Sequence, residues 1–286
     1  MRLILVPVAD RPECAVALES AFALSQSLSA SIVGCHIRPH RHSSEPKPSR
    51  FSLFSDHDAE WQAAIRGKSG ESARKKAERL FCKMAKQHDF RVSNRVSSGA
   101  ANIASWREVV GSPDHIMGIH GPVSDMLVVS RPGTKSKLGR IFLMAAMMKS
   151  YRPVLILPPK SGRKPGKRIA IAWNQSGEAS RAVAAAIPLL QQAQEVNIIA
   201  LGPENSPGPK STHLASYLAR WGVKANRISG KGRDEEQEML KLYRETKSDL
   251  LVMGAYSRSR LREQVFGGMT EHMLSNANIP VFMLHS

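Results

Sequence analysis

The sequence has few cysteines, few aromatic residues and no long apolar run, and each shortage excludes a class of protein. Its three cysteines, Cys14, Cys35 and Cys82, are odd in number and lack metal-ligand spacing, so we expect reduced thiols and neither a disulfide framework nor a metal site. The longest apolar run, Ile141–Met148, is far shorter than the roughly 18 residues that a membrane-spanning helix needs. We therefore do not expect a membrane as a partner.

Signals for secretion and for hydrolytic chemistry are also missing. The first apolar run, Leu3–Val8, is too short for the core of a signal peptide and has no small-residue cleavage site behind it, so it predicts a first strand and a cytoplasmic protein. The chain contains no Gly-x-Ser-x-Gly elbow and no His-Glu-x-x-His pair. Nothing else in the sequence argues for a catalytic nucleophile, and we expect no enzyme.

What the chain has in excess is positive charge. With 41 Lys and Arg against 24 Asp and Glu, its net charge is +17 in an otherwise ordinary globular composition. Such an excess attracts polyanions through long-range electrostatics. No basic stripe with interleaved aromatic residues is evident, so we interpret the charge as a solvated, self-repelling surface and do not expect nucleic acid as a partner.

Segments that occur twice in the same order indicate an internal duplication. Ser124–Val129 is similar to Ser248–Met253, and Pro153–Leu157 is similar to Pro280–Leu284. Continuous aliphatic runs that alternate with amphipathic helices are typical of parallel strands buried on both faces. The pattern predicts an α/β protein with two doubly wound, mainly parallel five-stranded sheets in tandem, each Rossmann-like.

The boundary between the repeats falls in a basic connection that is rich in Pro and Gly. Pro158–Arg168 disfavours a helix, and its Lys and Arg residues keep it solvated. We predict an N-terminal domain at residues 1–159, a linker at 160–168 and a C-terminal domain at 169–286. Because an exposed apolar edge strand is a liability, we expect Pro153–Leu157 and Pro280–Leu284 to lie side by side as edge strands.

Two weaker patterns do not predict a site. His36, His40 and His42 cluster after a strand, but no carboxylate or cysteine lies at ligand spacing, so they are interpreted as surface histidines. Gly202–Ser211 resembles a phosphate-binding P-loop only faintly, because Pro209 removes an amide that such a loop would use. It is interpreted as a plain connection.

The segment Met253–Thr270 has the pattern of a phosphate-binding turn between a buried strand and a helix. Small residues at the end of a strand let backbone N–H groups approach an anion, and the N-terminus of the next helix adds a favourable partial charge. Gly254, Gly267 and Gly268 are placed for that task. The segment is therefore the best candidate for a ligand site.

These residues resemble the motif of the universal stress protein family, whose ATP-binding members carry Gly-x2-Gly-x9-Gly-[Ser/Thr] between the fourth strand and the last helix. Here the pattern reads Gly254-x2-Ser257-x9-Gly267-Gly268, so the spacing and two glycines are kept while two positions differ. Upstream, Asn174 follows a strand at the position where the family has an Asp beside the nucleoside. The resemblance covers residues 168–286 and extends more faintly over 1–159 through the repeat.

The resemblance implies a fold like that of the adenine-nucleotide α-hydrolases and a non-catalytic, stress-related regulatory protein. It implies that the second domain binds ATP, ADP or AMP, and that the two halves form an intramolecular pseudo-dimer, with a homodimer left open. The binding residues that it implies are Asn174, Ser176, Met253, Gly254, Ser257, Gly267, Gly268, Met269 and Thr270.

The first half lacks the glycines that would complete an equivalent loop. Fixed spacing places Phe142–Ala146 there, and side chains at Met144 and Ala145 would crowd a triphosphate, so we expect a degenerate site in this half. In the second half, the changes at Ser257 and Gly268 leave an alternative open. In that alternative the protein is a structural or protein-interaction module that binds no nucleotide.

Overall fold

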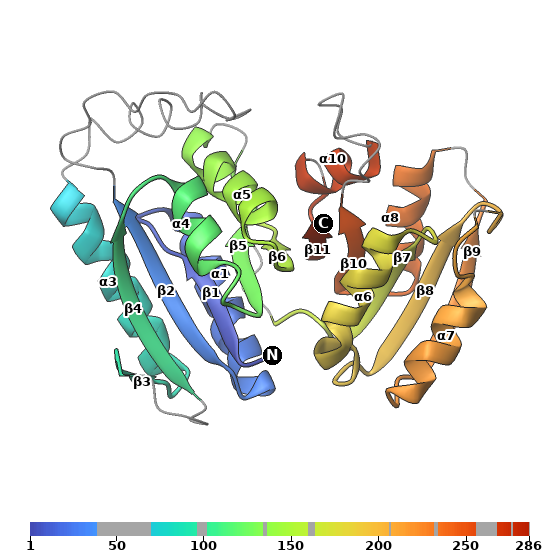
Figure 1. Cartoon of the computed structure of the whole chain (residues 1–286), viewed down its shortest axis with the longest axis horizontal. Helices are drawn as coiled ribbons and strands as arrows, with labels where there is room; N and C mark the ends of the chain where they lie inside the picture. Colours follow the sequence, from blue (N-terminus) through green and yellow to red (C-terminus); the bar gives the residue numbers. More distant parts are fainter. Residues whose placement is uncertain are drawn as a thin grey trace. The chain divides into compact units, whose positions relative to one another are not determined.

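The chain folds into two compact units of mixed α/β structure (Figure 1). The computed structural model describes residues 1–38, 70–95, 102–133, 136–159, 164–205, 207–231, 234–255, 268–275 and 277–285. Met1–Ser150 and Pro159–Gly162 form the first unit, and Tyr151–Pro158 and Arg163–Ser286 form the second. The predicted fold class is confirmed, and each unit is described by itself below.

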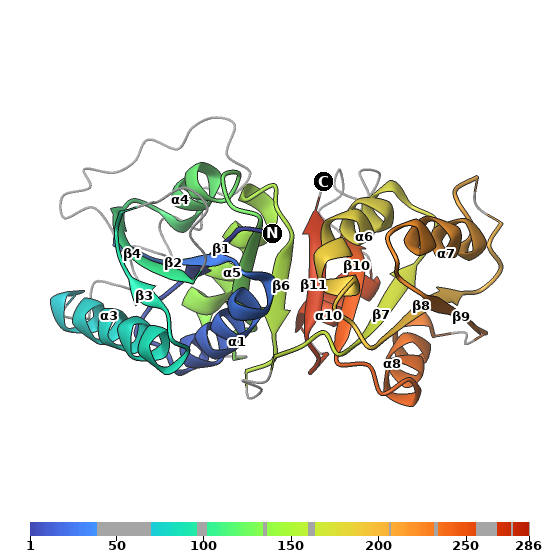
Figure 2. The ribbon, with the colours of Figure 1, turned by 90° about the horizontal axis from the view of Figure 1, so that it is seen from below.

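The first unit contains a parallel sheet with the strand order β3-β4-β2-β1-β5. Figure 2 shows α1 and α3 on one side of this sheet and α4 on the other, where α4 packs against α5. The arrangement is doubly wound, as predicted. Its elements are β1 (Leu3–Pro7), α1 (Pro12–Leu28), β2 (Ser31–Arg38), α3 (Gly70–Gln87), β3 (Arg91–Val92), β4 (Ile103–Val110), α4 (Pro113–His120), β5 (Met126–Ser130) and α5 (Lys137–Lys149).

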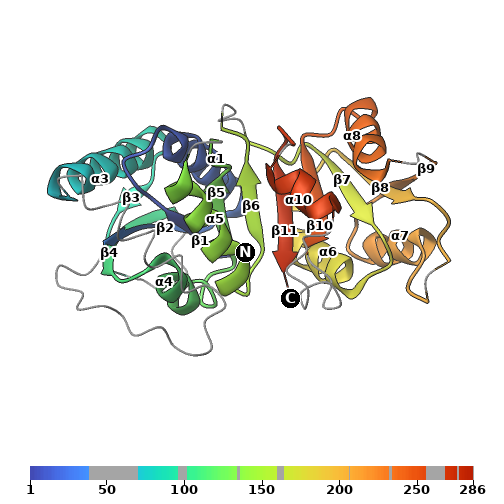
Figure 3. The same ribbon diagram turned by 90° about the horizontal axis from the view of Figure 1, so that it is seen from above.

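The second unit repeats this plan and adds one antiparallel strand. Its strand order is β6-β11-β10-β7-β8-β9, and the pairs from β11 to β9 are parallel. Helices α6 and α7 lie on one face, while α8 and α10 lie on the other (Figures 2 and 3). The elements are β6 (Val154–Leu157), β7 (Arg168–Trp173), α6 (Gly177–Leu190), β8 (Glu195–Leu201), α7 (Ser211–Arg220), β9 (Ala225–Gly230), α8 (Glu235–Glu245), β10 (Leu250–Ala255), α10 (Gly268–Ser275) and β11 (Val281–His285).

The predicted side-by-side arrangement of the two last strands is confirmed within the second unit. β6 pairs antiparallel with β11, so that Val154 lies opposite Met283 and Ile156 lies opposite Val281. Val154 and Ile156 are fully buried. This pairing gives the strand Val154–Leu157 its place in the second unit, because its apolar side chains and backbone groups find partners there.

Both units use an aspartate to fix the start of their central strands. Asp249 accepts hydrogen bonds from the backbone N–H groups of Gly166 (3.0 Å), Lys167 (3.1 Å) and Arg168 (2.9 Å). In the first unit, Asp125 does the same for Arg2 (2.5 Å) and Leu3 (2.9 Å). Backbone amides at the start of the central strand therefore gain charge-assisted partners at the same place in each repeat.

The core of the first unit contains a cluster of aromatic rings. Phe22 contacts Phe81 and Phe90 with ring centroids 5.5 and 5.0 Å apart, and Phe81 contacts Trp106 at 5.5 Å. Gly34 in β2 makes room for this cluster, because a Cβ there would lie 2.6 Å from the Phe81 ring. The fold therefore uses this glycine for packing.

All three cysteines are free, as expected. Cys14 and Cys35 are buried and Cys82 is partly exposed. Burial raises the pKa of the Cys35 thiol to about 12. A buried thiol that stays protonated is a structural residue rather than a nucleophile.

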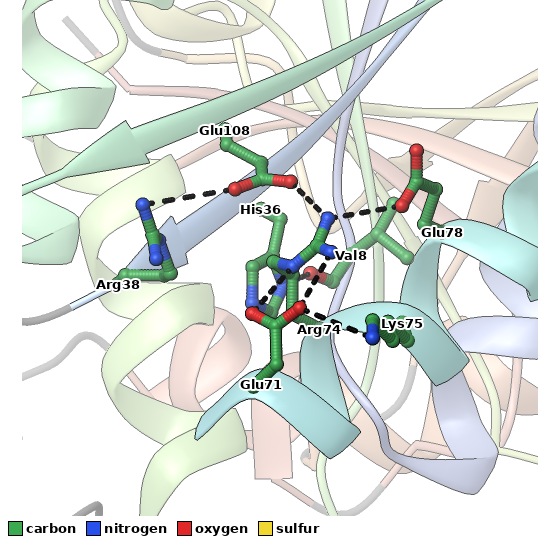
Figure 4. A network of polar contacts seen from close by, with 8 residues as sticks. All are labelled: Val8, His36, Arg38, Glu71, Arg74, Lys75, Glu78 and Glu108. Carbon is green, nitrogen blue, oxygen red and sulfur yellow. Dashed lines mark hydrogen bonds and ion pairs between the residues drawn. The ribbon is translucent and has the colours of Figure 1, made fainter.

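An ion-pair network joins the start of α3 to the ends of β2 and β4 (Figure 4). Arg74 binds Glu71 through two nitrogens at 2.8 and 3.0 Å and also donates to Glu78 (3.0 Å) and Glu108 (2.5 Å). Glu108 in turn pairs with Arg38 at 3.7 Å. The hydrogen bonds from Arg74 lower the pKa of Glu71 to about 2. The network thus holds together the two elements that flank residues 39–69.

We expect Arg74→Ala to make the stability against unfolding less dependent on pH in the acid range. In the wild-type protein the stabilisation from ionised Glu71 is complete above about pH 4.5 and is lost as the pH falls toward about 2, because the folded-state pKa is the lower one. Without Arg74 that pKa returns toward its ordinary value, so the midpoint of urea unfolding should change less between about pH 5 and pH 3. Lys75→Ala, which removes a weaker 3.6 Å contact to Glu71, is the control. Identical pH profiles for Arg74→Ala and wild type would contradict this.

Candidate functional site

The carboxyl edge of the second sheet brings most of the predicted site residues together. β7, β10 and β11 are parallel neighbours, so the turns that follow them leave from one edge (Figure 1). Asn174 and Ser176 follow β7, Met253 and Gly254 lie in β10, and Gly268, Met269 and Thr270 open α10. Ser257 and Gly267 lie outside the described residues.

Asn174 shapes the turn between β7 and α6. Its side-chain oxygen accepts hydrogen bonds from the backbone N–H (3.2 Å) and the hydroxyl (2.7 Å) of Ser176. Ser176 in turn caps α6, because its hydroxyl oxygen accepts from the N–H of Ala179 at 3.1 Å. The amide oxygen of Asn174 is therefore engaged in the turn, and its NH2 group is the part of the side chain that can donate to a ligand.

The connection from β8 to α7 is fastened over the end of β7. Gln175 has a left-handed backbone with a φ of 62° and donates from its side chain to the carbonyl of Gly208 at 3.0 Å. Trp173 donates from its indole N–H to the carbonyl of Pro209 at 2.8 Å. Gly208 must be small, because a Cβ there would collide with the Gln175 carbonyl oxygen. From the sequence, Gly202–Ser211 was interpreted only as a connection. Its Pro and Gly residues did not indicate that it packs over the end of β7.

Gly254 has a packing role that does not depend on any ligand. A Cβ at this position would lie 2.5 Å from the backbone nitrogen of Ala179 and 2.6 Å from the carbonyl carbon of Glu178. The absence of a side chain therefore lets the first turn of α6 rest directly on the end of β10. Of the two family glycines that this motif keeps, Gly254 is thus explained by packing alone.

Two carboxylates lie at this edge. Glu178 is in the first turn of α6 beside Gly254, and Glu236 lies so close to Gly268 that a Cβ there would collide with its carboxylate oxygen. His285, at the end of β11, is half-buried. Burial lowers the pKa of its imidazole below the ordinary value, and the opposing effect of the nearby Glu178 is the smaller one. The Glu236 carboxylate beside the first residue of α10 repels phosphate, whereas Glu178 is paired with Arg181 at 3.3 Å.

The equivalent edge of the first unit contains an arginine. Arg11 lies 4.9 Å over the ring of Phe142 and pairs with Glu13 at 3.5 Å. These three residues line a small cavity together with Cys14. Arg131, just after β5, is 95% buried, and burial lowers its pKa to about 10. Two arginine side chains thus lie in or near the place where the repeat would hold a ligand.

Counting by fixed spacing misplaced the end of the first-unit loop. Phe142–Ala146 was expected to correspond to the loop glycines, but α5 begins at Lys137, so these residues lie inside the helix. Six residues connect β5 to α5, whereas twelve connect β10 to α10. A shorter loop shifts the helix start, which a comparison at constant spacing misses.

Other predicted features of the sequence have plain structural explanations. His36 is buried, with its Nδ1 2.9 Å from the carbonyl oxygen of Val8 (Figure 4), so the expectation that it lies on the surface is wrong. His40 and His42 lie outside the described residues. In the described part of the chain, no group of His, Cys, Asp and Glu side chains is arranged to hold a metal ion. Nor is any helix in that part long and apolar enough to cross a membrane.

Comparison with known families identifies the second repeat. Residues 170–285 match the model of the universal stress protein family. This region is similar in sequence to a universal stress protein domain. The match begins in β7 and ends in β11, so it extends over all five parallel strands of the second sheet except the first two residues of β7. A comparison with curated proteins finds no match.

Solved structures share the fold of the whole chain. A universal stress protein from Archaeoglobus fulgidus is 15% identical and has a TM-score of 0.69, with 99% of this chain and 98% of that chain covered. A functionally unknown protein from Pseudomonas aeruginosa is 14% identical and has a TM-score of 0.55, with 100% and 92% covered. At such identities the likeness establishes the fold and not the activity.

We expect Gly254→Ala and Gly268→Ala to differ in stability. The new methyl group at 254 meets the backbone of α6, which cannot move aside, so the free energy of unfolding should fall by about 1–3 kcal/mol. At 268 the new group meets only the end of the Glu236 side chain, and alanine favours a helix over glycine by about 1 kcal/mol. Urea unfolding of both variants measures the difference. Equal losses would show that the two glycines do not differ in their packing.

Proposed function

We propose that this protein is a non-catalytic, cytoplasmic stress-response regulator whose second domain binds an adenine nucleotide. The observation that carries the proposal is the family match of residues 170–285, combined with the motif spacing that sets Gly254 and Gly268 at the two ends of one loop. The proposed binding residues are Asn174, Ser176, Met253, Gly254, Ser257, Gly267, Gly268, Met269 and Thr270.

The parallel strands and helix N-termini of the second unit support this placement. Ligands of doubly wound sheets bind outside the carboxyl ends of the strands. The first turns of α6 and α10 both follow strands that end at this edge, and backbone N–H groups there favour anions. In the proposal, Asn174 contacts the nucleoside through its NH2 group, and the backbone around Gly267 and Gly268 contacts phosphate.

The first domain is proposed to act as a structural partner without a nucleotide. Arg11 and Phe142 occupy the equivalent edge there, and only six residues separate β5 from α5. An intramolecular pseudo-dimer of the two repeats, which the family resemblance implies, is part of the same proposal. A nucleotide located only in the first domain would overturn this division of roles.

A second candidate function is a structural or protein-interaction module that binds no nucleotide. Two observations favour it. Gly254 is required by packing against α6, so its presence does not by itself indicate a ligand, and the Glu236 carboxylate lies beside Gly268, where phosphate would approach. The two candidates differ in one measurable property, which is affinity for adenine nucleotides.

Calorimetric titration with ATP, ADP and AMP separates these candidates. We expect the wild-type protein to bind, and Gly267→Val to abolish ATP binding because a side chain there would prevent close approach of the phosphate. Ser257→Gly combined with Gly268→Ser restores the family pattern and should tighten binding about tenfold to a hundredfold, since a charge-assisted hydrogen bond is worth about 1.5–3 kcal/mol. If all three proteins bind equally, or none binds, this loop is not a phosphate site.

The carboxylate of Glu236 provides a more specific test. Its negative charge beside the first residue of α10 should repel a polyphosphate, so we expect Glu236→Gln to tighten ATP binding about tenfold and to leave adenosine binding unchanged. Glu235→Gln removes the same charge from the neighbouring, exposed position and should have a much smaller effect. A parallel gain for ATP and adenosine would mean that Glu236 does not face the phosphates.

A further inference from the structure

Two aromatic side chains lie exposed at the C-terminal end of α7, away from the edge that carries the candidate nucleotide site. Tyr217 is 39% exposed and Trp221 is 47% exposed. Their ring centroids lie 6.4 Å apart at an interplanar angle of 67°. Large aromatic rings are costly to leave in water, so a pair of them on one helix end marks an interaction surface.

The position of this pair is fixed by the backbone. Trp221 is the C-cap of α7, and its carbonyl accepts a hydrogen bond from the side chain of Gln191 at 3.0 Å. Gln191 is the C-cap of α6, so the ends of two helices are joined at this point. The rings are therefore presented on a rigid support, which reduces the entropy lost when a ligand binds.

The stretch of sequence that contains the aromatic pair has basic residues and no acidic ones. Between Glu204 and Asp234 the chain contains Lys and Arg but neither Asp nor Glu. Arg220 and Lys224, on either side of Trp221, are exposed and form no ion pair with any described residue. Arg220 in the last turn also favours the helix dipole, but Lys224 lies beyond the helix and has no such role.

This surface lies at the opposite end of the sheet from the proposed nucleotide site. α7 ends at Arg220, and the chain then turns into the amino end of β9, which is the edge strand of the second unit (Figure 1). The candidate nucleotide residues lie at the carboxyl ends of β7 and β10. The two surfaces can therefore be tested independently.

We propose that Tyr217, Arg220, Trp221 and Lys224 form a docking surface for single-stranded nucleic acid. An exposed ring stacks on a base of any sequence, and flanking Arg and Lys side chains bind the phosphates on either side. Charge complementarity favours this occupant over a second copy of the chain, whose same patch would carry like charge. Insertion into lipid would bury the polar side chains that share the exposed face of α7, which are Thr212, His213 and Ser216.

Fluorescence anisotropy with a labelled oligodeoxythymidine of about 12 nucleotides tests the stacking. We expect Trp221→Ala to weaken binding at least about tenfold and Trp221→Phe to restore most of the affinity, because one stacked base is lost and then regained. Tyr151→Ala is the matched control, since Tyr151 is 73% exposed next to β6, which is separated from β9 by four other strands. The absence of binding, or equal binding by wild type and Trp221→Ala, would overturn the proposal.

The salt dependence of the same measurement tests the charges. Arg220→Gln combined with Lys224→Gln should reduce the slope of log affinity against log salt by about 1.4, since each phosphate contact to a single strand contributes about 0.7. Arg244→Gln, which removes the corresponding last-turn arginine of α8, should leave the slope unchanged. Equal competition by inorganic polyphosphate or by poly-glutamate would also overturn the proposal, because neither polyanion has a base to stack.

Discussion

The register of both sheets depends on an aspartate that holds the start of the central strand. Asp249 accepts hydrogen bonds from three backbone N–H groups at the start of β7, and Asp125 accepts hydrogen bonds from two at the start of β1. Each aspartate lies directly before the neighbouring strand, β10 or β5, so the bond sets how the two central strands start relative to each other. The carboxyl ends of those strands, five or six residues later, carry the turns of the candidate site. A one-residue slip would move every side chain to the opposite face.

Much of this fold could be predicted because the buried strands are continuous aliphatic runs and the helices are amphipathic. The Ser-Asp pairs before β5 and β10 marked the duplication, and the apolar runs Pro153–Leu157 and Pro280–Leu284 marked two strands that needed a partner. The start of α5 could not be predicted in the same way. Loop length is not encoded in hydrophobic periodicity, so the comparison at fixed spacing placed the helix start too late.

The candidate site was predicted less completely, because the sequence does not show whether a glycine is needed for a ligand or for packing. Gly254 is in the motif, yet in the structure the backbone of α6 already requires it. The glycine at 208 received no role from the sequence, although it lets the β8–α7 connection reach Gln175. Both are cases of close backbone approach between segments that are distant in sequence. Such contacts follow from tertiary packing, which local patterns do not contain.

The net charge of +17 does not show where the basic residues lie, whereas the structure shows different charged residues at the two ends of the second sheet. At the carboxyl edge of the second sheet, the described residues beside the glycines include the acidic Glu178 and Glu236, and Glu178 is paired with Arg181 at 3.3 Å. At the other end of the same sheet, Arg220 and Lys224 flank an exposed aromatic pair. In the sequence these residues did not stand out as a stripe, because Tyr217 and Trp221 are brought together only by the four-residue spacing of a helix. Polyanion attraction and nucleotide binding are therefore separate questions for this protein, and a variant at one edge should leave the other unaffected.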